Sequence, residues 1–209
     1  MEKNKSDLLA EVADYYSAKL AEHGATPRGV DWNGEESQIL RFEQLIKIIQ
    51  QPRGFSINDL GCGYGALFDY LRPKYQDFSY TGCDVSSDMI LAARARHATS
   101  PNIQFVVAAA PPEIADYGIA SGVFNVKLGR NEAEWLDYFK ATLDVLDRTS
   151  QQGFAFNCLT SYSDVDKMRD YLYYADPCDW FDYCKTMFSR HVSLLHDYGL
   201  YEFTIIVRK

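Results

Sequence analysis

Three alternating glycines and two aspartates are the residues of this chain best placed to bind a nucleotide-like ligand. A short apolar run ends in Asp59 and leads directly into Gly61, Gly63 and Gly65. Glycine suits such a turn because it adopts backbone angles closed to other residues and lets a ligand approach the main-chain N–H groups. About twenty residues later a second strand-like run ends in Asp84, where a carboxylate would meet a ribose diol.

The glycines alone do not identify the ligand. Gly61-x-Gly63-x-x-Ala66 also fits the relaxed dinucleotide-binding pattern, so an NAD(P)-dependent oxidoreductase is one interpretation. Asp59 favours a cationic ligand, because a carboxylate just before the first glycine is an unfavourable neighbour for a pyrophosphate. S-adenosylmethionine carries a sulfonium and an α-ammonium in that region, and a carboxylate would stabilise both.

Residues 57–65 and 80–90 resemble the first and second motifs of the class I (Rossmann-like) S-adenosylmethionine-dependent methyltransferases. The resemblance covers residues 35–209 and implies a doubly wound α/β fold, a seven-stranded mostly parallel sheet with a reversed C-terminal strand. It implies S-adenosylmethionine as the cofactor, with Asp59 near its methionine part and Asp84 on its ribose. Further cofactor-binding residues that it implies are Gly61, Cys62, Gly63, Gly65, Val85, Met89 and Ser121.

One expected family feature is missing. After a strand at residues 103–107, many members place an acidic or polar group against the adenine amine, but residues 108–111 read Ala-Ala-Ala-Pro. Adenine recognition would then fall to main-chain groups or to other residues.

Alternating strand and helix patterns after residue 35 predict repeated βα units around a mostly parallel sheet. Helix starts are expected at Ser86, at an Asn131-x-x-Glu134 capping box and at Ser163. Near the C-terminus, two β-rich runs are joined by a turn at residues 197–201, which predicts a hairpin that a dinucleotide-binding domain lacks. The other predicted strands are 78–83, 103–107, 114–119, 153–158, 192–196 and 202–208.

Residues 1–34 are predicted to form a helical lid on a single domain spanning 1–209. Apolar residues at helical spacing predict a helix that stops at Gly24. In related small-molecule methyltransferases such segments often cover the cofactor and shape the acceptor pocket. The lid candidates are Tyr15, Tyr16, Trp32, Gln38 and Arg41. Arg41 could reach the cofactor carboxylate, or could simply be a solvated arginine on a packed helix.

Methyl transfer from a sulfonium chiefly requires alignment of the acceptor and exclusion of water, so no general base is obligatory. If one is used, His196 in the C-terminal hairpin is the best candidate, together with the neighbouring Tyr198. Asn125, after the fourth strand, is expected to contact the acceptor. The aromatic and acidic segment 171–183 either lines the acceptor pocket, suiting a cationic or aromatic acceptor, or belongs to the core.

Composition favours a small-molecule enzyme of the cytoplasm. The net charge of −8 argues against nucleic acid as a partner, and no apolar run approaches the length of a membrane span. Five cysteines without Cys-x-x-Cys spacing indicate neither a disulfide framework nor a metal site. We therefore expect a monomer or homodimer that methylates an oxygen or nitrogen of a small molecule. A non-catalytic module that binds S-adenosylmethionine is the other alternative.

Overall fold

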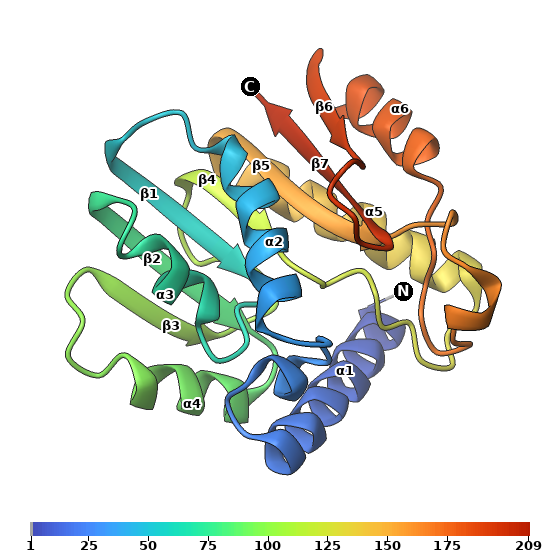
Figure 1. Ribbon diagram of the computed structural model, residues 1–209, viewed down its shortest axis with the longest axis horizontal. Coiled ribbons are helices and arrows are strands. Elements are labelled where there is room, and N and C mark those ends of the chain that lie inside the picture. The colour runs from blue at the N-terminus through green and yellow to red at the C-terminus, as the bar shows by residue number, and fades with distance from the viewer. Residues whose placement is uncertain (1) are drawn as a thin grey trace.

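The computed structural model describes residues 2–209, with side chains described from residue 7 onward. Seven strands form one sheet in the order β3-β2-β1-β4-β5-β7-β6 (Figure 1). The strands are β1 (Arg53–Leu60), β2 (Gln76–Asp84), β3 (Ile103–Val107), β4 (Ala115–Ala120), β5 (Ser150–Leu159), β6 (His191–Leu195) and β7 (Glu202–Arg208). The helices are α1 (Glu2–His23), α2 (Glu35–Leu45), α3 (Ala66–Leu71), α4 (Ser87–Arg96), α5 (Glu132–Arg148) and α6 (Pro177–Met187).

The last strand is reversed, as the sequence predicts. β1 pairs in parallel with β2 and β4, β2 with β3, and β4 with β5, whereas β7 is antiparallel to both β5 and β6. The carboxyl ends of the parallel strands therefore meet at one edge of the sheet, where ligands bind in open α/β folds.

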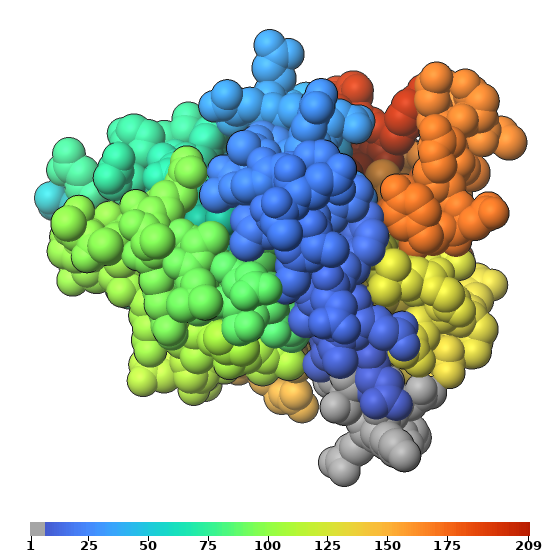
Figure 2. Space-filling view, turned by 90° about the horizontal axis from the view of Figure 1, so that it is seen from below, coloured from blue at the N-terminus to red at the C-terminus, as the bar shows by residue number. Residues whose placement is uncertain are grey.

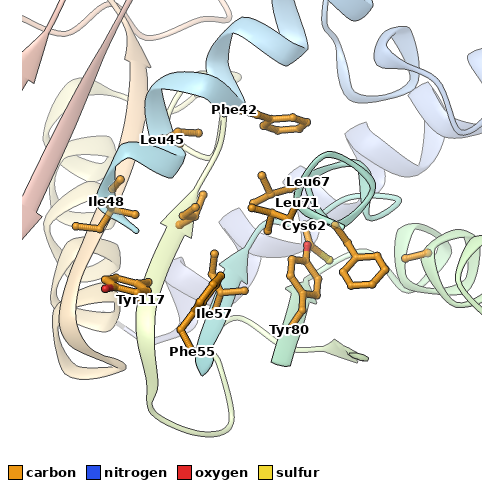
Figure 3. Packing of buried hydrophobic residues seen from close by; sticks show 14 of the residues in the cluster. Phe42, Leu45, Ile48, Phe55, Ile57, Cys62, Leu67, Leu71, Tyr80 and Tyr117 are labelled. Atoms are coloured by element: carbon orange, nitrogen blue, oxygen red, sulfur yellow. The ribbon is translucent and has the colours of Figure 1, made fainter. Parts of the chain in front are cut away.

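Helices cover both faces of the sheet, because successive side chains of a strand point to opposite faces. In β5, Phe154, Phe156 and Cys158 join the apolar cluster under α5 and α6, while Ala155 joins the cluster under α2, α3 and α4. Figure 3 shows the second of these clusters, with residues of α2 and α3 above those of β1, β2 and β4. The carboxyl edge of the sheet is covered by the N-terminal segment.

The N-terminal segment lies across that edge. Figure 2 shows its blue surface between the green surface around α4 and the yellow surface of α5. Helix α1 ends at His23, and Gly24 follows in a left-handed conformation (φ +69°), which is the predicted helix stop. A short 3-10 helix, η1 (Pro27–Val30), then leads toward α2.

Two predicted helix starts are confirmed and one is wrong. The Ser86 hydroxyl accepts the Met89 N–H, and Asn131 Oδ1 accepts the Glu134 N–H. Ser163 begins no α-helix: its hydroxyl donates to the Thr160 carbonyl, and only a 3-10 turn follows at Val165–Lys167. The helix of this region is α6, which the Asp176 carboxylate caps.

Residues 165–172 carry helix-like apolar spacing without a capping side chain, whereas Pro177 at the first position of α6 is pre-organised for a helix start. Among residues 2–209 we find no helix with both the length and the apolar character needed to cross a membrane.

Candidate functional site

A cavity lies at the carboxyl edge of the sheet, between the strand ends and the N-terminal segment. Its floor is residues 61–64 of the glycine loop, and its sides come from the ends of β2, β3 and β4 and from α5. Leu9, Tyr16, Val30 and Trp32 of the N-terminal segment cover it. This first cavity spans about 1050 Å³ including space open to solvent, of which about 100 Å³ is space that the centre of a water molecule can occupy.

The glycine loop is fixed to the end of β2. The N–H groups of Gly61 and Cys62 both donate to the Cys83 carbonyl, at 2.8 and 3.1 Å. Gly61 has φ +74°, and a Cβ there would lie 2.6 Å from Val123 Cγ2. Only glycine meets both requirements, because other residues rarely adopt this conformation and no space exists for a side chain.

Asp84 lies at the edge of the first cavity with its carboxylate held in one orientation. Its Oδ2 accepts the Gly63 N–H and its Oδ1 accepts the Ser86 N–H, both at 2.9 Å. Burial raises the pKa of Asp84, although these N–H donors oppose the shift. The glycine loop thus orients the carboxylate that the sequence predicts to bind a ribose.

Asp59 also faces the first cavity, but it is buried at the end of β1 and accepts the Tyr80 hydroxyl. Burial raises its pKa to about 7; the Tyr80 hydrogen bond lowers it, and the charge of Asp84 raises it further. A carboxylate with this pKa is poised to ionise when a cationic ligand arrives.

Most of the remaining predicted cofactor residues near the glycine loop also line this cavity, but Gly65 does not, and its carbonyl contacts His97 Nε2 at 3.2 Å instead. Met89 is buried against it, and Val85 and Cys62 contribute to its wall. Ser121 stands out because its buried hydroxyl has no hydrogen-bond partner among the residues that the structure describes. Such an orphaned group normally has a partner that the protein chain does not supply.

A second cavity of about 1460 Å³, also counted with its open mouth, adjoins the first. Its walls come from the loop after β4, the end of β5, residues 163–174 and the start of β7. Four residues line both cavities: Tyr16, Val30, Trp32 and Gly122. The two spaces therefore meet beneath the N-terminal segment.

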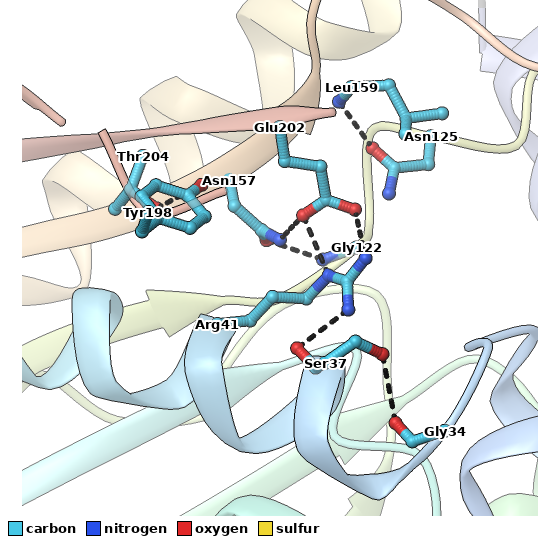
Figure 4. Close-up of polar contacts among 10 residues, drawn as sticks. All are labelled: Gly34, Ser37, Arg41, Gly122, Asn125, Asn157, Leu159, Tyr198, Glu202 and Thr204. Carbon is cyan, nitrogen blue, oxygen red and sulfur yellow. Dashed lines mark hydrogen bonds and ion pairs between the residues drawn. The ribbon is translucent and has the colours of Figure 1, made fainter. Parts of the chain in front are cut away.

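Asn125 is buried in the wall of the second cavity. Its Oδ1 accepts the Leu159 N–H at 3.1 Å, and its main-chain carbonyl accepts the Tyr173 N–H at 2.8 Å. In Figure 4 its amide nitrogen points away from Leu159. This geometry leaves a fixed N–H donor for a ligand, so the predicted acceptor contact keeps a structural basis.

Arg41 lies elsewhere than expected. It does not line the first cavity; its Nε and Nη2 donate to the two oxygens of Glu202 at 2.8 Å, and its Nη1 donates to the Ser37 carbonyl (Figure 4). A guanidinium occupied in this way does not reach a cofactor in the first cavity. Sequence reasoning missed the pair because 160 residues separate its members, and no local pattern marks the partner.

His196 and Tyr198 line neither cavity. His196 is exposed and packs beside Tyr162 and Phe203, while the Tyr198 hydroxyl bonds Thr204 Oγ1 at 3.0 Å. The hairpin does lie at the carboxyl edge, but β6 is four strand positions from β1. At about 4.8 Å per strand, that separation is roughly 19 Å, so the base candidate lies at the expected edge of the sheet but away from β1 and the glycine loop.

The aromatic segment 171–183 divides between the two interpretations. Tyr171 and Tyr174 line the second cavity, whereas Trp180 stacks on Phe139 at 3.6 Å in the core. Sequence reasoning missed the part of α5 that lines the first cavity, which includes Tyr138 and Thr142. The amphipathic pattern of α5 indicates burial and does not distinguish core from cavity wall.

Among the lid candidates, Tyr16, Trp32 and Gln38 line the first cavity. Tyr15 instead donates its hydroxyl to Asp31 at 2.7 Å, within the N-terminal segment itself.

The strand order with its reversed β7, together with a glycine loop that holds an acidic residue at the end of β2, is the arrangement of a class I methyltransferase. Comparison with known proteins agrees. The family model of a methyltransferase domain matches residues 57–153. A Mycobacterium tuberculosis (strain ATCC 25618 / H37Rv) protein with the name "Putative methyltransferase Rv1506c" is 56% identical over 164 residues, covering 78% of this chain and 99% of the relative. The chain belongs to the class I S-adenosylmethionine-dependent methyltransferase family.

Two further similarities are more distant. A trans-aconitate 2-methyltransferase from Rhodopseudomonas palustris (strain HaA2) is 34% identical over 103 residues, which is 45% of this chain and 40% of that protein. The structure of a complex described as DhpI-SAM-HEP has a TM-score of 0.68 at 16% identity, covering 97% of this chain and 98% of that one. At this identity, the structural similarity concerns the fold.

Proposed function

We propose that this protein transfers the methyl group of S-adenosylmethionine to an oxygen or nitrogen of a small-molecule acceptor. The observation that carries the proposal is the meeting of two cavities at Tyr16, Val30, Trp32 and Gly122. The first cavity carries the family's cofactor motifs, and the second is lined by polar and aromatic groups. A methyl donor and an acceptor need this kind of contact, because in-line transfer requires the reacting atoms about 3–3.5 Å apart.

The residues of the first cavity fit the cofactor. Asp84 would accept the ribose hydroxyls, and Asp59 would face the cationic methionine part. The Ser121 hydroxyl, which lacks a partner within the chain, would gain one from the ligand. Ala108 and Ala109 also line this cavity and present no polar side chain, so adenine would be held by packing and main-chain groups. When bound, S-adenosylmethionine supplies an already activated methyl group.

The second cavity supports a positioning role for the protein more than acid–base chemistry. No histidine is found among the described residues that line either cavity. Burial raises the pKa of Tyr16, so its phenol at the boundary stays neutral and keeps an O–H that can donate a hydrogen bond to an acceptor molecule. Asn125 adds an amide donor. These groups would align an acceptor, and the N-terminal segment above them would exclude water.

A small-molecule acceptor is further supported by the acidic balance of the chain and by the name of the Rhodopseudomonas palustris relative, which specifies trans-aconitate as its substrate. The cysteines at 62, 83, 158, 178 and 184 are all free, which supports a reducing compartment such as the cytoplasm as part of the proposal.

Calorimetric titration with S-adenosylhomocysteine, with NAD⁺ and NADP⁺ titrated in parallel, tests the cofactor. Binding of S-adenosylhomocysteine alone, at micromolar Kd or tighter, is the expected result. Binding of a dinucleotide alone would overturn the proposal and favour the oxidoreductase alternative. Release of S-adenosylhomocysteine in the presence of a panel of phenols, carboxylic acids and amines then separates an enzyme from a non-catalytic binding module.

A further inference from the structure

Trp32 occupies the boundary between the two cavities. It is one of the four residues that line both, and it is the largest of them. The other two tryptophans, Trp135 and Trp180, are buried in the core and line neither cavity. The position of this one indole therefore decides how the two spaces communicate.

The indole is held in a slot with two different walls. On one side the Arg41 guanidinium lies over its ring, 3.8 Å from the centroid. The six-membered ring also lies against the main chain at Gly122, where a Cβ would approach Trp32 Cζ2 to 2.5 Å. Gly122 also has φ +76°, so both its conformation and its close contact with the indole call for glycine.

Buried polar groups tie the two walls together. The Gly122 N–H donates to Asn157 Oδ1 at 2.8 Å, Asn157 Nδ2 donates to Glu202, and Glu202 pairs with Arg41 (Figure 4). The exposed fractions of Arg41, Glu202 and Asn157 are 6%, 1% and 0%. These contacts form a closed ring with Trp32, and two of the groups in the ring, Arg41 and Glu202, also line the second cavity.

We propose that Trp32 is a positioning residue that narrows the opening between the cofactor and acceptor cavities and closes the cofactor cavity, and that Arg41, Glu202 and Asn157 hold it in place. The inference rests on the proposed function and assigns a positioning task to these residues. A fixed indole at the boundary limits which acceptor shapes approach the methyl group. It also holds the N-terminal segment closed over the cofactor.

The test measures the dissociation rate of S-adenosylhomocysteine by stopped-flow displacement, with melting temperature recorded for every variant. Trp32→Ala is expected to speed dissociation about tenfold, the scale of one desolvated cation–π contact, while Trp32→Phe stays within about threefold of the wild type. Gly122→Ala, whose added methyl group would clash with the indole, should reproduce the effect of Trp32→Ala.

Arg41→Lys keeps the charge but loses the planar stacking surface, so it should also speed dissociation. If Arg41 acts through Trp32, the double variant Trp32→Ala/Arg41→Lys dissociates no faster than Trp32→Ala alone. Independent, additive effects of the two substitutions would overturn that assignment. The matched control, Trp180→Phe, should lower the melting temperature and leave the dissociation rate unchanged.

Tryptophan emission gives a second readout that needs no destabilising substitution. The wild type should change emission on titration with S-adenosylhomocysteine, and Trp32→Phe should lose that change. An unaltered dissociation rate in Trp32→Ala, or an emission change that persists in Trp32→Phe, would overturn the inference while the proposed function stands. Failure of S-adenosylhomocysteine to bind the wild type would overturn both.

Discussion

Arg41 and Glu202 form a two-point ion pair, Nε to Oε2 and Nη2 to Oε1, each at 2.8 Å, that joins α2 to the first residue of the reversed strand β7. Both side chains are almost completely buried. The pair connects the element that follows the N-terminal segment with a strand near the far side of the sheet. Arg41 packs on Trp32, and Glu202 is linked to Gly122 through Asn157. Because Trp32 and Gly122 line both cavities, the ion pair supports the residues at their boundary.

Removing one charge of this pair should be costly. Glu202→Gln leaves the buried guanidinium without its counter-charge, and we expect a loss of about 3–5 kcal/mol in the free energy of unfolding, measured by urea denaturation. The control is Asp166→Asn, which breaks the exposed pair with Lys167 and should cost no more than about 1 kcal/mol. Equal effects of the two substitutions would contradict a special role for the buried pair.

Asp84→Ala should weaken binding of S-adenosylhomocysteine by about 1.5–3 kcal/mol, the scale of hydrogen bonds to a charged group. The same substitution also frees the Gly63 and Ser86 N–H groups, so we expect a small decrease in melting temperature. Calorimetry measures the first effect and thermal denaturation the second. Asp88→Ala, an exposed acid in the first turn of α4, is the matched control and should leave affinity unchanged. Unchanged affinity in Asp84→Ala would refute the ribose assignment.

Asp59 should make the ligand-free protein less stable as pH rises. Its folded-state pKa of about 7 lies above the ordinary value of 3.8, so the folded state binds the proton more tightly than the unfolded state between these values. Stability is therefore greatest below the ordinary value and falls as pH rises toward 7. Asp59→Asn should raise the melting temperature at pH 8 and change it little near pH 4.

Asp116 provides a control, because its substitution should change the melting temperature at pH 8 in the opposite direction. Burial would raise the pKa of this carboxyl, but hydrogen bonds from Ser56 and Gln152 outweigh burial and lower it. Its ionised form stabilises the fold above pH 4, so Asp116→Asn should lower the melting temperature at pH 8. If both substitutions shift the melting temperature in the same direction at pH 8, the electrostatic interpretation of Asp59 is wrong.

The Asp59 carboxyl should also make ligand affinity depend on pH. If Asp59 must be ionised to face the ligand ammonium, affinity for S-adenosylhomocysteine should rise from pH 5.5 to pH 7, by up to about tenfold per unit. Asp59→Asn should remove this dependence. Calorimetry at each pH measures this affinity. If affinity depends on pH in the same way in the wild type and in Asp59→Asn, the assignment is wrong.

Ser121→Ala should have opposite effects on stability and on binding. Its hydroxyl is buried without a partner, so its removal should leave the melting temperature unchanged or raise it. If the ligand supplies the missing partner, affinity for S-adenosylhomocysteine should fall by about 0.5–1.5 kcal/mol. Ser150→Ala removes another orphaned hydroxyl, one outside both cavities, and should change stability only.

Much of the architecture follows from local sequence. The glycine loop, the acid at the end of β2, the N-terminal caps of α4 and α5 and the C-terminal hairpin are all predicted correctly. Each depends on residues within a few positions of one another, whose backbone preferences act without the rest of the fold. The helix expected after Ser163 was wrong, because Val165 at the start of the apolar spacing is exposed and the helix of this region starts at Asp176 and Pro177.

The chain by itself therefore determined the class of fold and the cofactor motifs. Only the tertiary structure decided that Arg41 faces Glu202 instead of a ligand, and that Trp32 stands between two cavities. It also decided that His196, at the correct edge of the sheet, lines neither cavity. The physical reason is common to all three. Lateral order in a sheet and buried ion pairs are set by contacts between segments far apart in the sequence, and no periodic pattern along the chain encodes which distant partner a side chain will meet.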